Sequence, residues 1–232
     1  MAEPAKEMTI WDHLEELRKR LLVAVLALLT AAGVSFFFAP RLIDILAVPV
    51  GGMENLHVIR VTENISVTMK ISLLGGVILA MPVIVYELLI FVLPGLHKNE
   101  RKWIYFAVPA ASLLFLGGVL FAYWIMLPVA IPFLVSFLKT QSDIILSDYI
   151  DFVTNVLFYI GLSFEMPMII FILAKLKLVT AKALLKQWRI AIIVIAAIAA
   201  VATPTTDPVN MAILMVPLFF LYWLSVLLAA LA

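Results

Sequence analysis

The sequence contains no cysteine, only three histidines and few charged residues, which make up 13% of its 232 positions. Without cysteine there is no disulfide, no thiolate metal site and no cysteine nucleophile. His13, His57 and His97 are too scattered for a metal-ligand motif, and no glycine-rich phosphate-binding loop is present. Basic stripes with interleaved aromatic residues, which would indicate nucleic-acid binding, are also missing. We therefore predict a protein that is not an enzyme and that needs no metal, cofactor or nucleic acid.

Apolar residues dominate instead, at 65% of the chain, which is far above the share in soluble domains. Runs long enough to cross a bilayer lie at 21–39, 71–93, 104–127, 152–174 and 211–231, and a shorter run lies at 190–202. We expect one domain, an all-α polytopic membrane protein with six transmembrane helices and short fifth and sixth spans. Residues 1–20 are expected to form a cytoplasmic N-terminal helix. The run at 190–202 covers only about 20 Å of a hydrocarbon core of about 30 Å.

The distribution of positive charge predicts the orientation, because cytoplasmic loops carry an excess of Lys and Arg. One side of the six-span arrangement holds most of the 16 basic residues: Lys6, Arg18, Lys19, Arg20, Lys98, Arg101, Lys102, Lys175, Lys177, Lys182, Lys186 and Arg189. The other side holds Arg41, Arg60, Lys70 and Lys139. Both termini are therefore expected in the cytoplasm.

Two acidic residues, Glu16 and Glu100, stand within this basic face. A carboxylate there can pair with an incoming guanidinium through charge-assisted hydrogen bonds. Each also has a simpler interpretation: Glu16 is four residues from Arg20 on a helix, and Glu100 precedes a helix whose macrodipole favours a negative charge. Residue types alone leave both interpretations open.

Two further acidic residues fall inside the apolar runs. Glu165 is near the middle of the fourth run, and Glu87 is nearer the cytoplasmic end of the second. Charged groups in a membrane are costly, so such residues usually face a cavity, a partner or a transport pathway. Glu87 is shallow enough to reach the interface by extending its side chain.

The outer loops have recognisable local patterns. Residues 42–46 favour a short interfacial helix that the segment 49–52, which contains Pro49, would stop. Residues 57–62 alternate like an extended segment, and residues 148–151 favour another surface helix.

Several motifs occur in a specific order along nearly the whole chain. They are HLEELRKR at 13–20, Pro49, Thr62-Glu63 leading to Lys70, FVLPGLHKNER at 91–101, SFEMP at 163–167 and Thr203-Pro204. This series resembles the TatC family, the polytopic core subunit of the twin-arginine protein translocase.

The resemblance implies a receptor that exports folded proteins across a prokaryotic plasma membrane, driven by the proton gradient. It implies that Glu16 and Glu100 contact the paired arginines of a signal peptide. The other residues of that surface would be Arg18, Phe91, Pro94 and Arg101. It also implies self-association, contact with membrane lipid, and single-span partners, TatA and TatB.

Inside the membrane the resemblance implies that Glu165 faces the concave interior of the bundle, where the signal peptide and partners engage. Glu87 and Met211 are further partner-binding candidates, and Pro49 and Glu63 are structural loop residues. The chain departs from the family pattern at three positions: Met211 replaces a Gln, Trp223 replaces a Glu and Glu87 replaces a Gln. These replacements predict fewer polar groups for partner binding near the outer ends of the last two spans.

Two other functions fit parts of the sequence. A proton-coupled small-solute transporter would use Glu165 as its proton carrier, but would show an inverted repeat with broken helices. An intramembrane hydrolase would need a Ser or Asp pair at matched depth, and only Glu165 is a deep acid.

Overall fold

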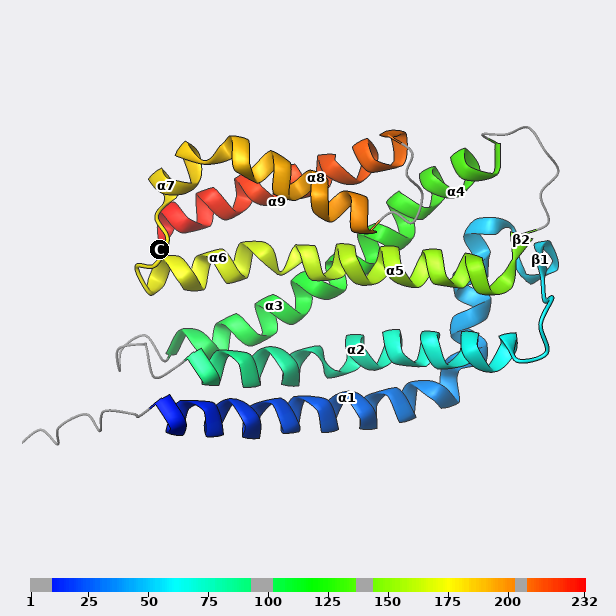
Figure 1. The fold of residues 1–232 in the computed structure, drawn as a ribbon, viewed down its shortest axis with the longest axis horizontal. Helices are drawn as coiled ribbons and strands as arrows, with labels where there is room; N and C mark the ends of the chain where they lie inside the picture. The colour runs from blue at the N-terminus through cyan, green and yellow to red at the C-terminus, as the bar shows by residue number, and fades with distance from the viewer. Residues whose placement is uncertain (1–9, 93–101, 137–143, 203–207) are drawn as a thin grey trace, which may run out of the picture.

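The computed structural model describes residues 10–92, 102–136, 144–202 and 208–232. Within these ranges, five helical segments are long and apolar enough to cross a membrane, and Trp188–Val201 is a shorter apolar helix. The predicted all-α membrane fold with six spans is confirmed. The helices lie roughly side by side along one direction in an elongated bundle (Figure 1).

The first two spans form a tightly packed antiparallel pair, α1 (Ile10–Ala47) and α2 (Glu63–Val92). Small residues allow the close approach: a Cβ atom added to Gly76 would lie 2.7 Å from the Cα atom of Ala32. Helices in membranes commonly associate through such contacts, because lipid supplies little hydrophobic drive between them. The pairing puts the beginning of α1 and the end of α2 at the same end of the bundle.

The last turns of α1 bend across the opposite end of the bundle (Figure 1). Pro40 lies inside the helix and cannot donate a backbone hydrogen bond, which explains the bend. The predicted separate helix at 42–46 is thus the bent end of α1. A 3₁₀ turn, Val48–Val50, follows and contains Pro49; Gly51, at φ 94°, closes it by donating its N–H to the carbonyl of Val48.

Two short strands meet at this end, which we call the β1–β2 end. After the 3₁₀ turn Met53–Asn55, β1 (Leu56–His57) pairs in parallel with β2 (Ile144–Ile145). The residues 148–151, expected as a surface helix, are instead the first turns of α5 (Leu146–Phe164). The apolar sequence that follows these residues extends the helix without interruption.

The third and fourth spans are each built from two helices. α3 (Lys102–Phe121) continues through a π-helical turn, Ala122–Met126, into α4 (Leu127–Ser136). α5 continues into α6 (Met166–Lys175), and Glu165 lies at the break between them.

The short helix α7 (Ala181–Lys186) leads into the last two spans, α8 (Trp188–Ala202) and α9 (Pro208–Leu231). α8 has 15 residues, about 22 Å, and is short as expected. α9 has 24 residues, about 36 Å, which is longer than the short sixth span that the sequence suggested.

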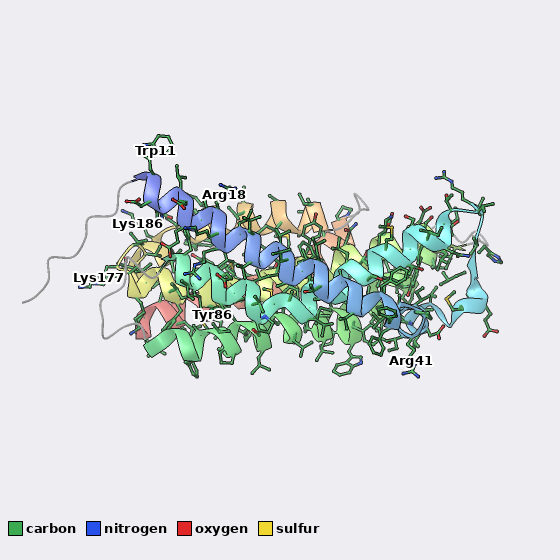
Figure 2. The ribbon with its side chains drawn as sticks, turned by 90° about the horizontal axis from the view of Figure 1, so that it is seen from below. Trp11, Arg18, Arg41, Tyr86, Lys177 and Lys186 are labelled. Carbon is green, nitrogen blue, oxygen red and sulfur yellow. The ribbon has the colours of Figure 1, made fainter. Side chains whose placement is uncertain are left out.

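Basic side chains gather at the end opposite to β1 and β2. Figure 2 shows Arg18, Lys177 and Lys186 at this end together with Trp11, whereas Arg41 lies at the far end. We call it the basic end of the bundle.

Candidate functional site

A shared ion pair joins α1 and α2 at the basic end. The guanidinium of Arg20 donates from Nη1 to Oε2 of Glu87 at 3.1 Å, and its Nη2 lies 3.6 Å from Oε1 of Glu16. The Glu87 side chain is 9% exposed, and those of Arg20 and Glu16 are 33% and 21% exposed. The antiparallel packing explains the meeting, because it brings the start of α1 and the end of α2 to the same depth.

One cation therefore serves two carboxylates, and the cluster keeps one negative charge in excess. The second oxygen of Glu16, Oε2, is buried and has no hydrogen-bond partner within the described ranges. Buried acceptors without a donor are unfavourable. This arrangement can accept a further cationic donor, and a guanidinium suits it best because it donates two parallel hydrogen bonds to one carboxylate.

The cluster opens into a surface groove of about 540 Å³ along α1. Three carboxylates and two basic groups line it with one apolar side chain: Asp12, Glu15, Glu16, Lys19, Arg20 and Val23. We call this the acidic groove. Lys19 lies 2.9 Å from Glu15, but both side chains are more than 60% exposed, so that pair is screened by water.

An aromatic contact lies close to the acidic groove. The ring of Phe91, at the end of α2, stacks on His13 of α1 with centroids 4.4 Å apart and planes 21° apart. Phe91 thus lies at the same end as Glu16, and Arg18 is exposed there. Pro94, Glu100 and Arg101, which the sequence also assigned to this surface, lie outside the described residues.

Glu165 is deep in the bundle, at the break between α5 and α6. It is 5% exposed, and its Oε1 is buried with no hydrogen-bond partner among the described residues. Its neighbours Ser163 and Met166 line an apolar groove of about 510 Å³ between α5, α6, α8 and α9, although Glu165 itself does not.

The three residues that depart from the family pattern, Glu87, Met211 and Trp223, lie in different parts of the bundle. Glu87 is part of the ion-pair cluster at the basic end. Met211 is partly buried and packs against the core at the start of α9. Trp223 is 45% exposed and makes edge contacts with the rings of Phe219 and Tyr222.

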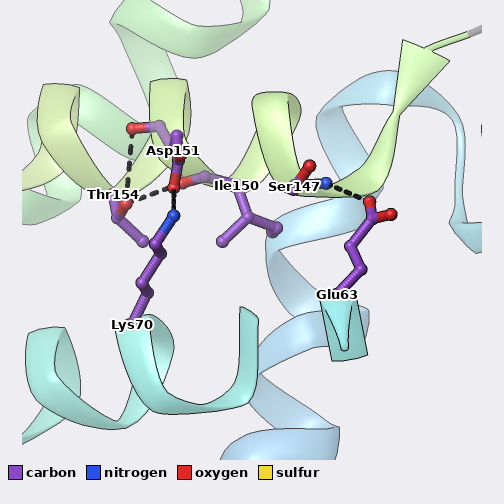
Figure 3. Close-up of polar contacts among 6 residues, drawn as sticks. All are labelled: Glu63, Lys70, Ser147, Ile150, Asp151 and Thr154. Carbon is purple, nitrogen blue, oxygen red and sulfur yellow. Dashed lines mark hydrogen bonds and ion pairs between the residues drawn. The ribbon is translucent and has the colours of Figure 1, made fainter. Parts of the chain in front are cut away.

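Glu63 connects the two loops at the β1–β2 end. Its Oε2 accepts hydrogen bonds from the backbone N–H groups of Ile59 and Arg60, at 3.0 and 3.1 Å. Its Oε1 accepts one from the N–H of Ser147 at 2.7 Å, across to the start of α5 (Figure 3). Only 3% of Glu63 is exposed, so these donors have little access to water.

Sequence reasoning missed two pairings, Arg20 with Glu87 and Lys70 with Asp151. Their residues are 67 and 81 positions apart in the sequence, so no local spacing reveals these pairings. The sequence did contain a signal for the pairing of Arg20 with Glu87. Consecutive spans run antiparallel, so an acidic residue near the end of the second span is expected to lie close to a basic residue near the start of the first.

Comparisons with known proteins show which family the chain matches. A family model described as Sec-independent protein translocase protein (TatC) matches residues 12–217. The chain is 36% identical over 230 residues to the Sec-independent protein translocase protein TatC of Deinococcus radiodurans, covering 95% of this chain and 85% of that protein. It is 40% identical over 221 residues to the chloroplastic TATC protein of Arabidopsis thaliana, covering 94% of this chain but only 65% of that protein.

A solved structure has the same fold. The crystal structure described as the twin arginine translocase receptor TatC matches with a TM-score of 0.84 and 33% sequence identity, covering 94% of this chain and 98% of that one.

Proposed function

The chain belongs to the TatC family of Sec-independent protein translocase subunits, and from this premise we propose that it is the receptor that binds twin-arginine signal peptides. In this role it recruits folded cargo proteins and organises the partner subunits that export them, with energy from the proton gradient. It carries out no covalent chemistry of its own.

The observation that carries the proposal is the cluster of Glu16, Arg20 and Glu87. The carboxylates of Glu16, which is partly buried, and Glu87, which is buried, share the guanidinium of Arg20. One oxygen of Glu16 has no hydrogen-bond donor in the described part of the chain. A signal-peptide arginine satisfies that oxygen and neutralises the excess charge. The stacked rings of Phe91 and His13 supply an aromatic surface beside it. Glu100 would hold the second arginine, with Arg18, Pro94 and Arg101 completing the surface.

The basic end is assigned to the cytoplasm. Lys and Arg side chains gather there (Figure 2), as the positive-inside tendency of membrane proteins requires. Both termini of the chain are then cytoplasmic, and the membrane is the plasma membrane of a prokaryote. Signal peptides reach the acidic groove before any part of the cargo crosses the bilayer.

Glu165 is assigned to contact with partner helices or the apolar part of the signal peptide. A buried carboxyl oxygen without a donor is costly in a bilayer, so a polar group from another chain stabilises it. The neighbouring apolar groove offers a surface for such a helix, and the short α8 reduces the membrane thickness there. We assign the single-span partners TatA and TatB to this site, with Met211 contributing packing.

The test is equilibrium binding of a twin-arginine signal peptide to the purified chain in nanodiscs, against the same peptide with paired lysines. We expect selective binding to the arginine peptide and a loss of about ten-fold or more in Glu16→Gln, because a charge-assisted hydrogen bond of about 1.5–3 kcal/mol is lost. Glu54→Gln is the matched control, since Glu54 is exposed on the 3₁₀ turn at the β1–β2 end, away from the acidic groove. Equal binding of both peptides, or equal effects of the two variants, would contradict the proposal.

A further inference from the structure

A third groove, separate from the acidic groove and from the apolar groove near Glu165, lies between α1, α2 and α5 in the half of the bundle nearer to the β1–β2 end. Its volume is about 480 Å³. Its polar side chains are Lys70, Asp151, Thr154 and Asn155. Its remaining walls are apolar and are formed by Leu28, Leu73, Leu74, Val77 and Phe158.

Lys70 and Asp151 form an ion pair across this groove (Figure 3). Their side chains are 41% and 44% exposed, so each charge also faces the groove. α2 has 30 residues, about 45 Å, and therefore extends about 7 Å beyond each side of a hydrocarbon core of about 30 Å. Lys70, about 10 Å from the start of α2, then lies close to the boundary between headgroups and hydrocarbon.

Asn155 lies about one helical turn deeper than Asp151 on α5. It is exposed, lines the groove and has no hydrogen-bond partner in the ranges that the structure describes. Thr154, next to it, already donates its hydroxyl proton to the carbonyl of Ile150 in its own helix. An amide without a partner is unfavourable at this depth, where no water replaces it. The amide of Asn155 is therefore available for a hydrogen bond with a group from outside the chain.

We propose that this groove binds a phospholipid with a phosphoethanolamine headgroup from the leaflet at the β1–β2 end. The phosphate lies on the Lys70 ammonium, and the primary ammonium of the lipid donates to the Asp151 carboxylate. Asn155 donates to an ester carbonyl of the lipid, and an acyl chain follows the apolar walls past Val77 and Phe158. The ion pair between Lys70 and Asp151 is thereby replaced by two ion pairs with the lipid, one from its phosphate to Lys70 and one from its ammonium to Asp151.

The order of polarity along the groove favours a lipid over a transmembrane helix. Opposite charges lie at the boundary, an amide lies one turn deeper, and apolar side chains lie below, which is the order of groups in a phospholipid.

The opposed charges also predict which headgroup is preferred. A primary ammonium donates hydrogen bonds to Asp151, whereas the quaternary ammonium of phosphocholine has no proton to donate. Phosphoglycerol has no cation for Asp151. We expect phosphatidylethanolamine to bind roughly ten-fold more tightly than phosphatidylcholine, the effect of one charge-assisted hydrogen bond.

The experiment is native mass spectrometry of the purified full-length chain with equimolar phosphatidylethanolamine, phosphatidylcholine and phosphatidylglycerol. In Lys70→Gln/Asp151→Asn, where the two side chains can still hydrogen-bond to each other, the preference for phosphatidylethanolamine should disappear. In Asn155→Leu all three lipids should bind several-fold more weakly, because they share the ester carbonyl. Asn64→Leu, an exposed asparagine outside the groove, is the matched control and should bind like the wild type.

Three results would overturn the proposal: equal binding of the three lipids to the wild-type chain, a preference that survives the double variant, or tightest binding of phosphatidylglycerol. If Asn155→Leu changes no lipid affinity but reduces the recovery of a co-expressed single-span subunit, the groove binds a helix and the lipid assignment is wrong. None of these outcomes depends on signal-peptide binding.

Discussion

Replacing Glu63 by alanine removes the acceptor of three backbone N–H groups at the β1–β2 end. These are the N–H groups of Ile59 and Arg60 before α2 and of Ser147 at the start of α5. Because Glu63 is 3% exposed, water replaces the carboxylate poorly. The variant should therefore loosen the connection between the two loops and lower the stability of the folded chain.

The magnitude follows from the hydrogen bonds. At about 1 kcal/mol net for each bond, alanine costs about 3 kcal/mol. For a chain of this size 1 kcal/mol corresponds to about 2–4 °C in the melting temperature, so we expect a decrease of about 6–12 °C. Glutamine keeps one carbonyl oxygen, which can retain the bond from Ser147, and should cost about half as much.

The assay is thermal unfolding in detergent, followed by circular dichroism, for Glu63→Ala, Glu63→Gln and the control Glu54→Ala. Glu54 is exposed on the nearby 3₁₀ turn, so its removal should leave the melting temperature unchanged. Hydrogen exchange of the Ser147 amide adds a local measurement, with fast exchange expected in Glu63→Ala alone. If Glu63→Ala melts like the control, or if glutamine costs as much as alanine, the reasoning is wrong.

Three other predictions concern the helices. Glu87→Gln should weaken twin-arginine peptide binding about three-fold, about 0.6 kcal/mol, because Arg20, released from Glu87, then competes with the peptide arginine for Glu16. Fluorescence anisotropy measures the affinity, and tighter binding would contradict this prediction. Gly76→Val should destabilise the chain by about 1–3 kcal/mol in a thermal melt, because its Cβ overlaps α1, whereas Gly33→Ala, with open space around it, should not; equal melting temperatures would refute the tight packing. Glu165→Gln should keep peptide affinity and reduce co-purification of single-span partners, with a larger reduction in Glu165→Ala; normal assembly in both variants would remove its assigned role.

The number of spans was predictable from the sequence because it depends on apolar run length alone. The helix ends were less so. The residues 42–46 are helical as expected, but they continue α1, since Pro40 bends that helix without ending it. The residues 148–151 are helical too, and the apolar sequence after them makes them part of α5.

The candidate site was predictable only in part. The type and sidedness of Glu16 singled it out, whereas its relation to Glu87 through Arg20 depends on how α1 and α2 are rotated against each other. The same holds for Lys70 and Asp151, which come from α2 and α5. The rotation and alignment of two packed helices depend on close contacts at small residues such as Gly76. Residue types and their spacing in the sequence do not reveal these contacts directly.

The most direct test of the account is to map where the paired arginines of a signal peptide bind. A photo-crosslinking residue placed next to the arginine pair, irradiated with the full-length chain in nanodiscs and analysed by mass spectrometry, reports the contacted segment. We predict crosslinks to the acidic groove on α1, between Asp12 and Val23, which disappear with the paired-lysine peptide. Crosslinks at the β1–β2 end or on α8, with none in the acidic groove, would contradict the central claim.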